Sequence, residues 1–185
     1  MAKTNDDCVT KAIDGSRFEL VRGDITKQET EAVVNAANKR LAPGGGVAGA
    51  IHRAAGDQLW EECKGLGGCE TGEAKITEGY ELPANYVIHT VGPVYSNSPE
   101  DAELLESSYR NSLELVREKG IESVSFPALS TGAFGYPEQE AGKIAINTIT
   151  DFLTRYSQPE LVRLVLYGKS SYGLHKELLS GINED

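Results

Sequence analysis

The chain has 185 residues, of which 39% are hydrophobic and 25% are charged, and its net charge at pH 7 is −10. This length fits one globular domain that buries its core without disulfide or metal support. The acidic balance argues against direct nucleic-acid binding and against an anionic membrane surface as a partner, because both are polyanions.

The sequence shows no targeting or membrane segment. No apolar run approaches the roughly 18 residues of a membrane span, and residues 1–7 lack the apolar stretch of a secretory signal. Cys8, Cys63 and Cys69 are an odd number and do not suggest a disulfide framework. We therefore expect a cytoplasmic protein with reduced cysteines.

The N-terminal part of the chain predicts an arm followed by two strands. Residues 1–16 are polar without a clear period and are expected to form a loose arm before a single domain of residues 17–185. Residues 17–22 alternate apolar and polar side chains, as a strand does, and end in a turn at Gly23-Asp24-Ile25-Thr26. Residues 31–37 contain an unbroken apolar run that favours a central strand.

The rest of the chain alternates helices and strands. The periodicity predicts helices over residues 47–55 and 57–64, strands over 73–80 and 86–91, a helix over 99–119, a strand over 123–128, a helix over 138–156, a strand over 161–167 and a helix over 171–179. This alternation predicts an α/β fold, a three-layer α/β/α sandwich with a central mixed sheet.

Two glycine-rich loops follow predicted strands. The first contains Gly44-Gly45-Gly46 directly before a helix, and the second spans residues 129–137. Glycine lets the backbone approach a ligand closely, and a helix start offers unpaired N–H groups and a partial positive charge. Because ligands in such folds bind beyond the carboxyl ends of strands, we expect the loops to meet there and to hold a phosphate group with backbone amides.

The first loop also permits a different interpretation. Gly44, Gly46 and Gly49 match the Gly-x-Gly-x-x-Gly pattern of dinucleotide-binding domains. In those domains the pattern follows the strand directly, whereas here residues 36–43 intervene. A nicotinamide-dependent oxidoreductase is therefore a weaker hypothesis that depends on the glycines alone.

Three side chains near these loops have both a functional and a structural interpretation. Asp24 can accept a hydrogen bond from an exocyclic amine such as that of adenine, or it can cap the turn that follows it. Asn38 can bind ribose hydroxyls or form a turn. Phe134 can lie against a sugar face or pack inward.

Histidines and cysteines suggest no metal site. Cys63 and Cys69 have no histidine pair nearby and are expected to fill apolar space. His89 lies in an apolar strand and is expected to be a core histidine, while His52 and His175 are expected to have packing or surface roles. We expect no metal and no cofactor.

The sequence resembles the macrodomain family in five motifs that occur in the family's order. These are Gly23-Asp24-Ile25-Thr26, Asn35-Ala36-Ala37-Asn38, Gly44-Gly45-Gly46-Val47, Ile88-His89-Thr90-Val91-Gly92-Pro93 and Ser130-Thr131-Gly132-Ala133-Phe134-Gly135-Tyr136-Pro137. Residues 49–56 and 71–74 resemble the MacroD subgroup, and the resemblance covers residues 17–180.

The resemblance implies ADP-ribose, or a protein carrying it, as the ligand. Asp24 would hold the adenine amine with the Ile25 amide beside it, and Tyr167 would line the adenine. Asn38 would position the distal ribose, which is the only catalytic role that the resemblance assigns. The diphosphate would lie between Gly45, Gly46 and Val47 on one side and Ser130, Thr131, Gly132, Ala133 and Phe134 on the other.

The implied activity is hydrolysis, either removal of ADP-ribose from acidic side chains or deacetylation of O-acetyl-ADP-ribose. One residue departs from the MacroD pattern: Ala48 stands where these hydrolases usually carry an aspartate that helps to position or activate water. Loss of a general base typically lowers a rate by about 10²–10⁴-fold, and substrate-assisted attack, in which a phosphate oxygen orients the water, is the route left for hydrolysis. A reader module that binds ADP-ribose without chemistry is therefore the alternative.

Overall fold

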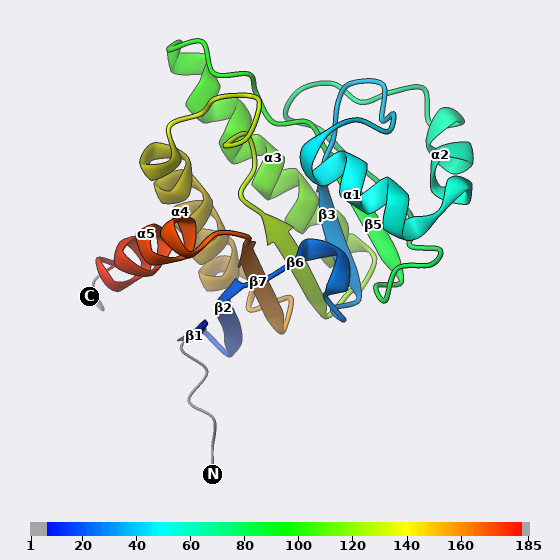
Figure 1. Cartoon of the computed structure of the whole chain (residues 1–185). Helices are drawn as coiled ribbons and strands as arrows, with labels where there is room; N and C mark the ends of the chain where they lie inside the picture. The colour runs from blue at the N-terminus through cyan, green and yellow to red at the C-terminus, as the bar shows by residue number, and fades with distance from the viewer. Residues whose placement is uncertain (1–6, 183–185) are drawn as a thin grey trace.

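A mixed β-sheet runs through the middle of the computed structural model, which describes residues 7–182 (Figure 1). Its strand order is β1-β2-β7-β6-β3-β5-β4. The strands are β1 (Cys8–Ile13), β2 (Ser16–Arg22), β3 (Ala32–Ala36), β4 (Ala74–Glu78), β5 (Tyr86–Thr90), β6 (Ser123–Pro127) and β7 (Leu161–Leu166). The five central strands are parallel, and β1 and β4 at the two edges run antiparallel to their neighbours.

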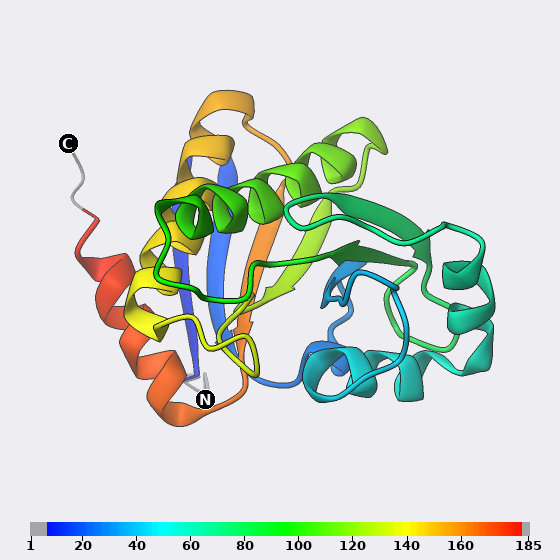
Figure 2. The ribbon, with the colours of Figure 1, turned by 90° about the horizontal axis from the view of Figure 1, so that it is seen from above.

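Helices cover both faces of this sheet (Figure 2). They are the short 3₁₀ helix η1 (Ile25–Lys27), α1 (Gly46–Ala55), α2 (Asp57–Lys64), α3 (Pro99–Glu118), α4 (Glu138–Tyr156) and α5 (Lys169–Ser180). Helices α3, α4 and α5 pack with one buried apolar cluster, and α1 and α2 pack with a second cluster on the opposite face. The predicted three-layer α/β/α sandwich with a mixed sheet is confirmed. In the part of the chain that the structure describes, no helix combines the length and the apolar character needed to cross a membrane.

Strand β3 lies in the interior of the sheet, between β6 and β5, because its sequence is apolar on both faces. Val34 packs into the cluster beneath α3 and α4, and Val33 packs into the cluster beneath α1 and α2. Each fully buried valine stabilises the fold by about 1.5–3 kcal/mol, so this strand is firmly held. The loop that follows it therefore leaves the sheet from an interior strand.

The prediction of a loose arm over residues 1–16 is wrong for its second half. Cys8–Ile13 form strand β1, which pairs in an antiparallel register with β2. The turn between them is Asp14-Gly15, with φ of 46° and 89°. An Asp-Gly pair with positive φ at both residues is typical of a two-residue hairpin, and this sequence signal was overlooked. The first six residues of the expected arm lie outside the described part of the chain.

Candidate functional site

The two glycine-rich loops meet across a cavity of about 300 Å³. Both loops lie at the same end of the sheet, where β3 and β6 end (Figure 1). The cavity is lined by Ala36, Ala37, Asn38, Gly44, Gly45, Gly46, Val47, Ala48, Ala128, Ser130, Gly132, Ala133 and Phe134. The prediction that the two loops meet is confirmed, and four of the expected ligand-binding residues, Asp24, Ile25, Thr131 and Tyr167, are not part of the cavity wall.

The first loop presents free backbone amides to the cavity. Gly46 has φ of +55°, a conformation that a Cβ disfavours, and it begins α1. The N-cap residue Gly45 provides no side-chain hydrogen bond to the first turn of this helix. A Cβ at Gly49 would overlap the carbonyl oxygen of Gly44, so the loop folds back tightly onto α1. The amides at the start of α1 are thereby left for an anionic ligand.

The second loop contributes a buried hydroxyl group. Ser130 has φ of +66°, which is strained for a residue with a side chain. Its backbone is held by a hydrogen bond from the Tyr136 amide, and Thr131 Oγ1 donates to the Ala128 carbonyl at 2.8 Å. The Ser130 Oγ is buried, and no described protein atom is its hydrogen-bond partner. This hydroxyl lies against Gly92, where an added Cβ would be 2.2 Å from it, so Gly92 leaves the space that the Ser130 side chain occupies.

Asn38 lines the cavity and also holds the first loop together. Its Nδ2 donates to the Ala42 carbonyl at 2.8 Å, and its Oδ1 accepts from the amides of Ala42 and Arg40 at 3.0 and 3.2 Å. The turn-forming interpretation of this residue is therefore confirmed. Its contact with a ribose stays a prediction, for which the second N–H of Nδ2 is the available donor.

Asp24 caps the turn after β2. Its Oδ1 accepts hydrogen bonds from Thr26 Oγ1 at 2.7 Å and from the Thr26 amide at 2.9 Å. These bonds lower the pKa of the Asp24 carboxyl, led by the hydroxyl of Thr26, so that the group is ionised at neutral pH. The capping interpretation is confirmed, and it leaves the second carboxylate oxygen available for a ligand.

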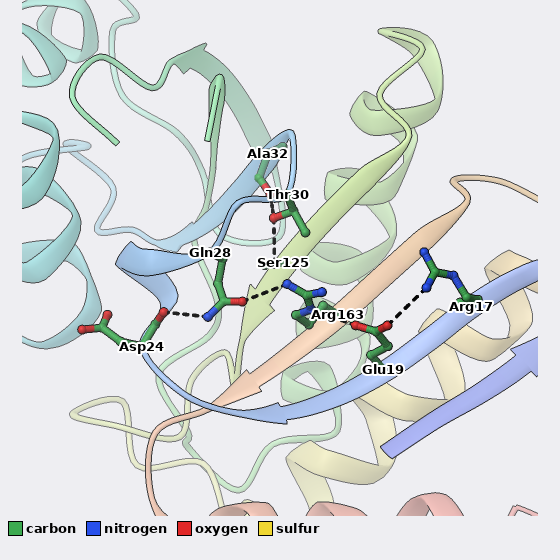
Figure 3. Close-up of polar contacts among 8 residues, drawn as sticks. All are labelled: Arg17, Glu19, Asp24, Gln28, Thr30, Ala32, Ser125 and Arg163. Atoms are coloured by element: carbon green, nitrogen blue, oxygen red, sulfur yellow. Dashed lines mark hydrogen bonds and ion pairs between the residues drawn. The ribbon is translucent and has the colours of Figure 1, made fainter. Parts of the chain in front are cut away.

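A polar network that the sequence analysis missed holds the backbone of Asp24 (Figure 3). Gln28 Nε2 donates to the Asp24 carbonyl at 2.9 Å, and Gln28 Oε1 accepts from Arg163 Nη1 at 3.0 Å. Arg163 Nε in turn donates to Glu19 at 2.9 Å. The Asp24 carboxylate points away from this network. The one signal in the sequence was an arginine inside the otherwise apolar strand β7.

Tyr167 lies at the adjacent strand end. It follows β7 directly, and the Gly23 amide donates to the Leu166 carbonyl at 2.9 Å, which keeps the ends of β2 and β7 together. Its side chain is 85% exposed, an unusual state for a large aromatic residue. Its contact with an adenine stays a prediction.

His89 is a core histidine, as predicted. Its Nδ1 lies 3.1 Å from Asn35 Nδ2, and its Nε2 lies 2.9 Å from Thr77 Oγ1. Because Thr77 Oγ1 donates to the Glu78 carbonyl, Nε2 carries the proton and Nδ1 accepts from Asn35. Burial, with a smaller repulsion from His52, lowers the pKa of His89 to about 3. Cys63 and Cys69 are buried free thiols on the same side of the sheet.

The loops around the cavity contain no carboxylate. The sequence has no Asp or Glu between Glu31 and Asp57, nor between Glu122 and Glu138, although the net charge is −10. The first of these segments carries three cations, at Lys39, Arg40 and Arg53. The local field at the cavity is therefore more favourable to an anion than the net charge implies.

Comparisons with known proteins agree with this geometry. Residues 34–145 match the model of the Macro domain family. A macro domain-containing protein of Methanosarcina mazei is 54% identical over 167 residues, which cover 90% of this chain and 89% of that protein. A Salmonella newport protein named O-acetyl-ADP-ribose deacetylase is 47% identical over 175 residues, with coverage of 92% and 98%. A structure of the Oceanobacillus iheyensis macrodomain with ADP is 44% identical, with a TM-score of 0.91 and coverage of 94% and 95%.

Proposed function

Because the chain belongs to the macrodomain family, we propose that it binds ADP-ribose in the cavity between the two glycine-rich loops and hydrolyses esters of that ligand. The substrates would be O-acetyl-ADP-ribose or proteins carrying ADP-ribose on acidic side chains. The name of the Salmonella relative and the ADP in the Oceanobacillus structure support this choice of ligand.

The observation that carries the proposal is the wall of the cavity, which offers backbone amides at a helix start but no carboxylate. The diphosphate would accept hydrogen bonds from the amides at the start of α1 and from those of the second loop. The adenine would extend toward Asp24 and Tyr167, and the distal ribose toward Asn38 and Phe134. Backbone dipoles would thus bind a dianion without a cluster of lysines, as suits an acidic protein.

The reaction would take place at an ester on the distal ribose. Ala48 lies in the cavity wall, where it contributes only a methyl group. A protein-derived carboxylate is therefore not provided at this position, and this observation favours the second candidate, a reader module that binds ADP-ribose without turnover. The two candidates share the binding site and differ only in chemistry.

Separate measurements of binding and of turnover distinguish these two functions. Calorimetry with ADP-ribose and with AMP tests the site, and equal affinities would contradict recognition of the distal ribose. Release of acetate from O-acetyl-ADP-ribose, and of ADP-ribose from a glutamate-modified protein, tests the hydrolase. Binding of ADP-ribose with no turnover above buffer would reject the hydrolase and leave the reader.

Two substitutions of Asp24 separate its two roles. Asp24→Asn keeps an oxygen that can cap the Thr26 amide but replaces the second oxygen with a donor. We expect its affinity for ADP-ribose to fall by about 1.5–3 kcal/mol, the value of a hydrogen bond to a charged group, with little change in thermal stability. Asp24→Ala should lose similar affinity and, in addition, about 1 kcal/mol of unfolding free energy with the cap. Calorimetry and thermal unfolding measure the two effects, and full affinity in Asp24→Asn would refute the adenine contact.

A further inference from the structure

We propose that Arg40 and Arg53, the rim arginines, dock the acidic polypeptide to which ADP-ribose is attached. The inference rests on the proposed binding of ADP-ribose in the cavity, and it names the class of substrate that this site favours. The distal ribose would lie toward Asn38, which lines the cavity. A protein joined to that ribose through an acidic side chain would therefore leave the cavity beside Asn38.

The Arg53 guanidinium lies beside the first glycine-rich loop. Gly49 and Arg53 are four residues apart on α1 and so share a face of this helix. A Cβ at Gly49 would be 3.0 Å from Arg53 Nη1 and 2.2 Å from the carbonyl oxygen of Gly44, so this one point touches both groups. A Cβ at Gly44 would in turn be 3.5 Å from Asn38 Nδ2. Because Gly44 and Asn38 line the cavity, Arg53 carries its charge to the cavity edge.

Arg40 belongs to the turn that Asn38 organises. The Arg40 amide donates to Asn38 Oδ1 at 3.2 Å, and the Leu41 amide donates to the Asn38 carbonyl at 2.9 Å. Leu41 has φ of +57° and is fully buried, which anchors the turn in the apolar cluster beneath α1 and α2. The Arg40 side chain itself is exposed. A fixed backbone with a free guanidinium suits a contact with a partner, because only the side chain has to be ordered on binding.

The rim arginines differ from the other arginines in having no partner. All eight arginines of the chain lie within residues 7–182. Five of the other six form ion pairs with carboxylates, and Arg155 lies over the ring of Tyr156 at 5.2 Å. Within these residues, neither Arg40 nor Arg53 has an ion pair or a side-chain hydrogen bond. The two guanidinium groups left without a partner thus lie at the same edge of the cavity.

Neighbouring residues do not neutralise the rim arginines. The segment between Glu31 and Asp57 contains no Asp or Glu. Lys39, which precedes Arg40, forms a long ion pair with Glu70 at 3.8 Å, and both side chains are largely exposed. Such a pair contributes little to stability, so Lys39 can exchange Glu70 for a carboxylate of the partner.

The chemistry of the guanidinium group favours carboxylates of a polypeptide. Arginine binds a carboxylate through two parallel N–H donors, a geometry that lysine does not provide. The acetyl group of O-acetyl-ADP-ribose carries no charge that the rim arginines could bind. A nucleic acid carrying ADP-ribose fits less well than a peptide, because it would extend a charge at every nucleotide over a protein of net charge −10. We therefore expect tighter binding of ADP-ribose that is attached within an acidic protein sequence.

Two synthetic peptides of equal length test the docking site on the full chain. Each carries one ADP-ribose, joined through its distal ribose by an amide in place of the ester, so that turnover does not affect the measurement. Glutamates flank the modified residue in one peptide and glutamines in the other. By calorimetry at an ionic strength of about 0.05 M, the glutamate peptide should bind about three- to tenfold more tightly, as two exposed ion pairs allow. The preference should disappear at about 1 M salt, which screens such pairs.

The double variant Arg40→Gln/Arg53→Gln should lose this preference while its Kd for free ADP-ribose stays within about threefold. Arg40→Lys/Arg53→Lys keeps the charges and should keep part of the preference. Arg110→Gln/Arg155→Gln is the matched control, because it removes the same charge from α3 and α4, which pack on the opposite face of the sheet from α1. The control should bind both peptides as the wild type does.

The outcomes separate the docking site from the proposed function. Equal binding of the two peptides by the wild type, or an undiminished preference in Arg40→Gln/Arg53→Gln, would overturn the docking site. So would an oligonucleotide with a terminal ADP-ribose that loses as much affinity in this variant as the glutamate peptide does. A wild type that binds neither peptide nor free ADP-ribose would reject the proposed function and the inference with it. If the double variant does not fold, Arg40→Gln alone decides and should lower the preference about twofold.

Discussion

A Gly46→Glu variant should lose at least about 100-fold in affinity for ADP-ribose, equivalent to about 2.7 kcal/mol, while keeping its fold. Gly46 begins α1 and lines the cavity, and a Cβ at this position meets no atom within 4 Å. The added side chain would therefore enter the cavity, where its carboxylate would occupy the place of the diphosphate at the helix N-terminus. Calorimetry with ADP-ribose measures this loss.

The stability cost of this substitution should be modest. The φ of +55° at Gly46 costs a residue with a side chain about 1–2 kcal/mol, and a carboxylate at a helix N-terminus returns about 0.3–1 kcal/mol of it. Gly120→Glu is the matched control, because Gly120 has φ of +67° and free space around its Cβ but lies at the end of α3, outside the cavity wall. Its affinity should equal that of the wild type. Undiminished binding by Gly46→Glu would mean that the diphosphate lies elsewhere.

The elements that the sequence predicts well are those whose signal is local. Helices α2 and α4 begin and end at the predicted residues because their apolar stripes have a 3.6-residue period and because Gly56, Gly65 and Pro137 border them. Strand β3 was recognised by its apolar run. The hairpin of β1 and β2 was missed although Asp14-Gly15 is also a local signal, because the polar residues before it obscured the alternation of the strand.

The loops of the site were predictable for a similar reason. Glycines that directly precede a helix, and loops that leave the carboxyl ends of strands, indicate an anion site without knowledge of any distant contact. For Asp24 and Asn38 the sequence allows both a structural and a ligand-binding role, because one oxygen or N–H of the side chain can bond to the loop while another bonds to a ligand. Only the structure separates these atoms from one another.

The supporting layers of the site depend on contacts that no local pattern encodes. Arg163 reaches Gln28 across 135 positions of the chain, and His89 reaches Asn35 across 54. In sequence, His89 lies in an apolar strand and His52 in a helix without a visible partner, which is compatible with a surface, core or catalytic role. Their proximity, with ring centroids 6.5 Å apart, arises from the parallel pairing of β3 with β5 and from the packing of α1 over β3.

The free energy of unfolding should fall steeply as the pH is lowered from about 6.5, the ordinary pKa of histidine. His89 has a pKa of about 3 in the folded protein, so between these values the unfolded chain binds a proton that the folded protein does not. The stabilisation by neutral His89 is complete above pH 6.5 and is lost as the pH falls toward 3, by about 1.4 kcal/mol per pH unit and on the order of 5 kcal/mol in all. Urea unfolding at intervals from pH 7 to pH 4.5 measures this slope.

Other titratable groups do not obscure the effect of His89 between pH 6.5 and pH 3. Burial also lowers the pKa values of His52 and His175, which makes the free energy of unfolding fall in the same direction. The pKa values of Asp24 and Asp101 are lowered from 3.8, so these two groups change the free energy of unfolding only below about pH 3.8. His89→Gln should therefore be less stable than the wild type at pH 7 but should show a slope smaller by about one proton between pH 6 and pH 4.5. Identical slopes in the two proteins would show that His89 is not the buried neutral group.

Protonation of His89 in the folded protein should weaken ligand binding only near pH 3, well below the pH at which the free energy of unfolding begins to fall. Protonation of Nδ1 would turn this acceptor into a donor facing Asn35 Nδ2, and the two N–H groups would repel one another. Asn35 directly precedes Ala36 in the cavity wall, so its displacement would move the start of the first glycine-rich loop. Above pH 4.5 folded His89 stays neutral, so the affinity for ADP-ribose should not follow the fall in the free energy of unfolding, and the loss should appear only as the pH approaches 3. In His89→Gln, which cannot gain this proton, affinity should fall less near pH 3, and an equal fall in both proteins would show that protonation of His89 does not affect ligand binding.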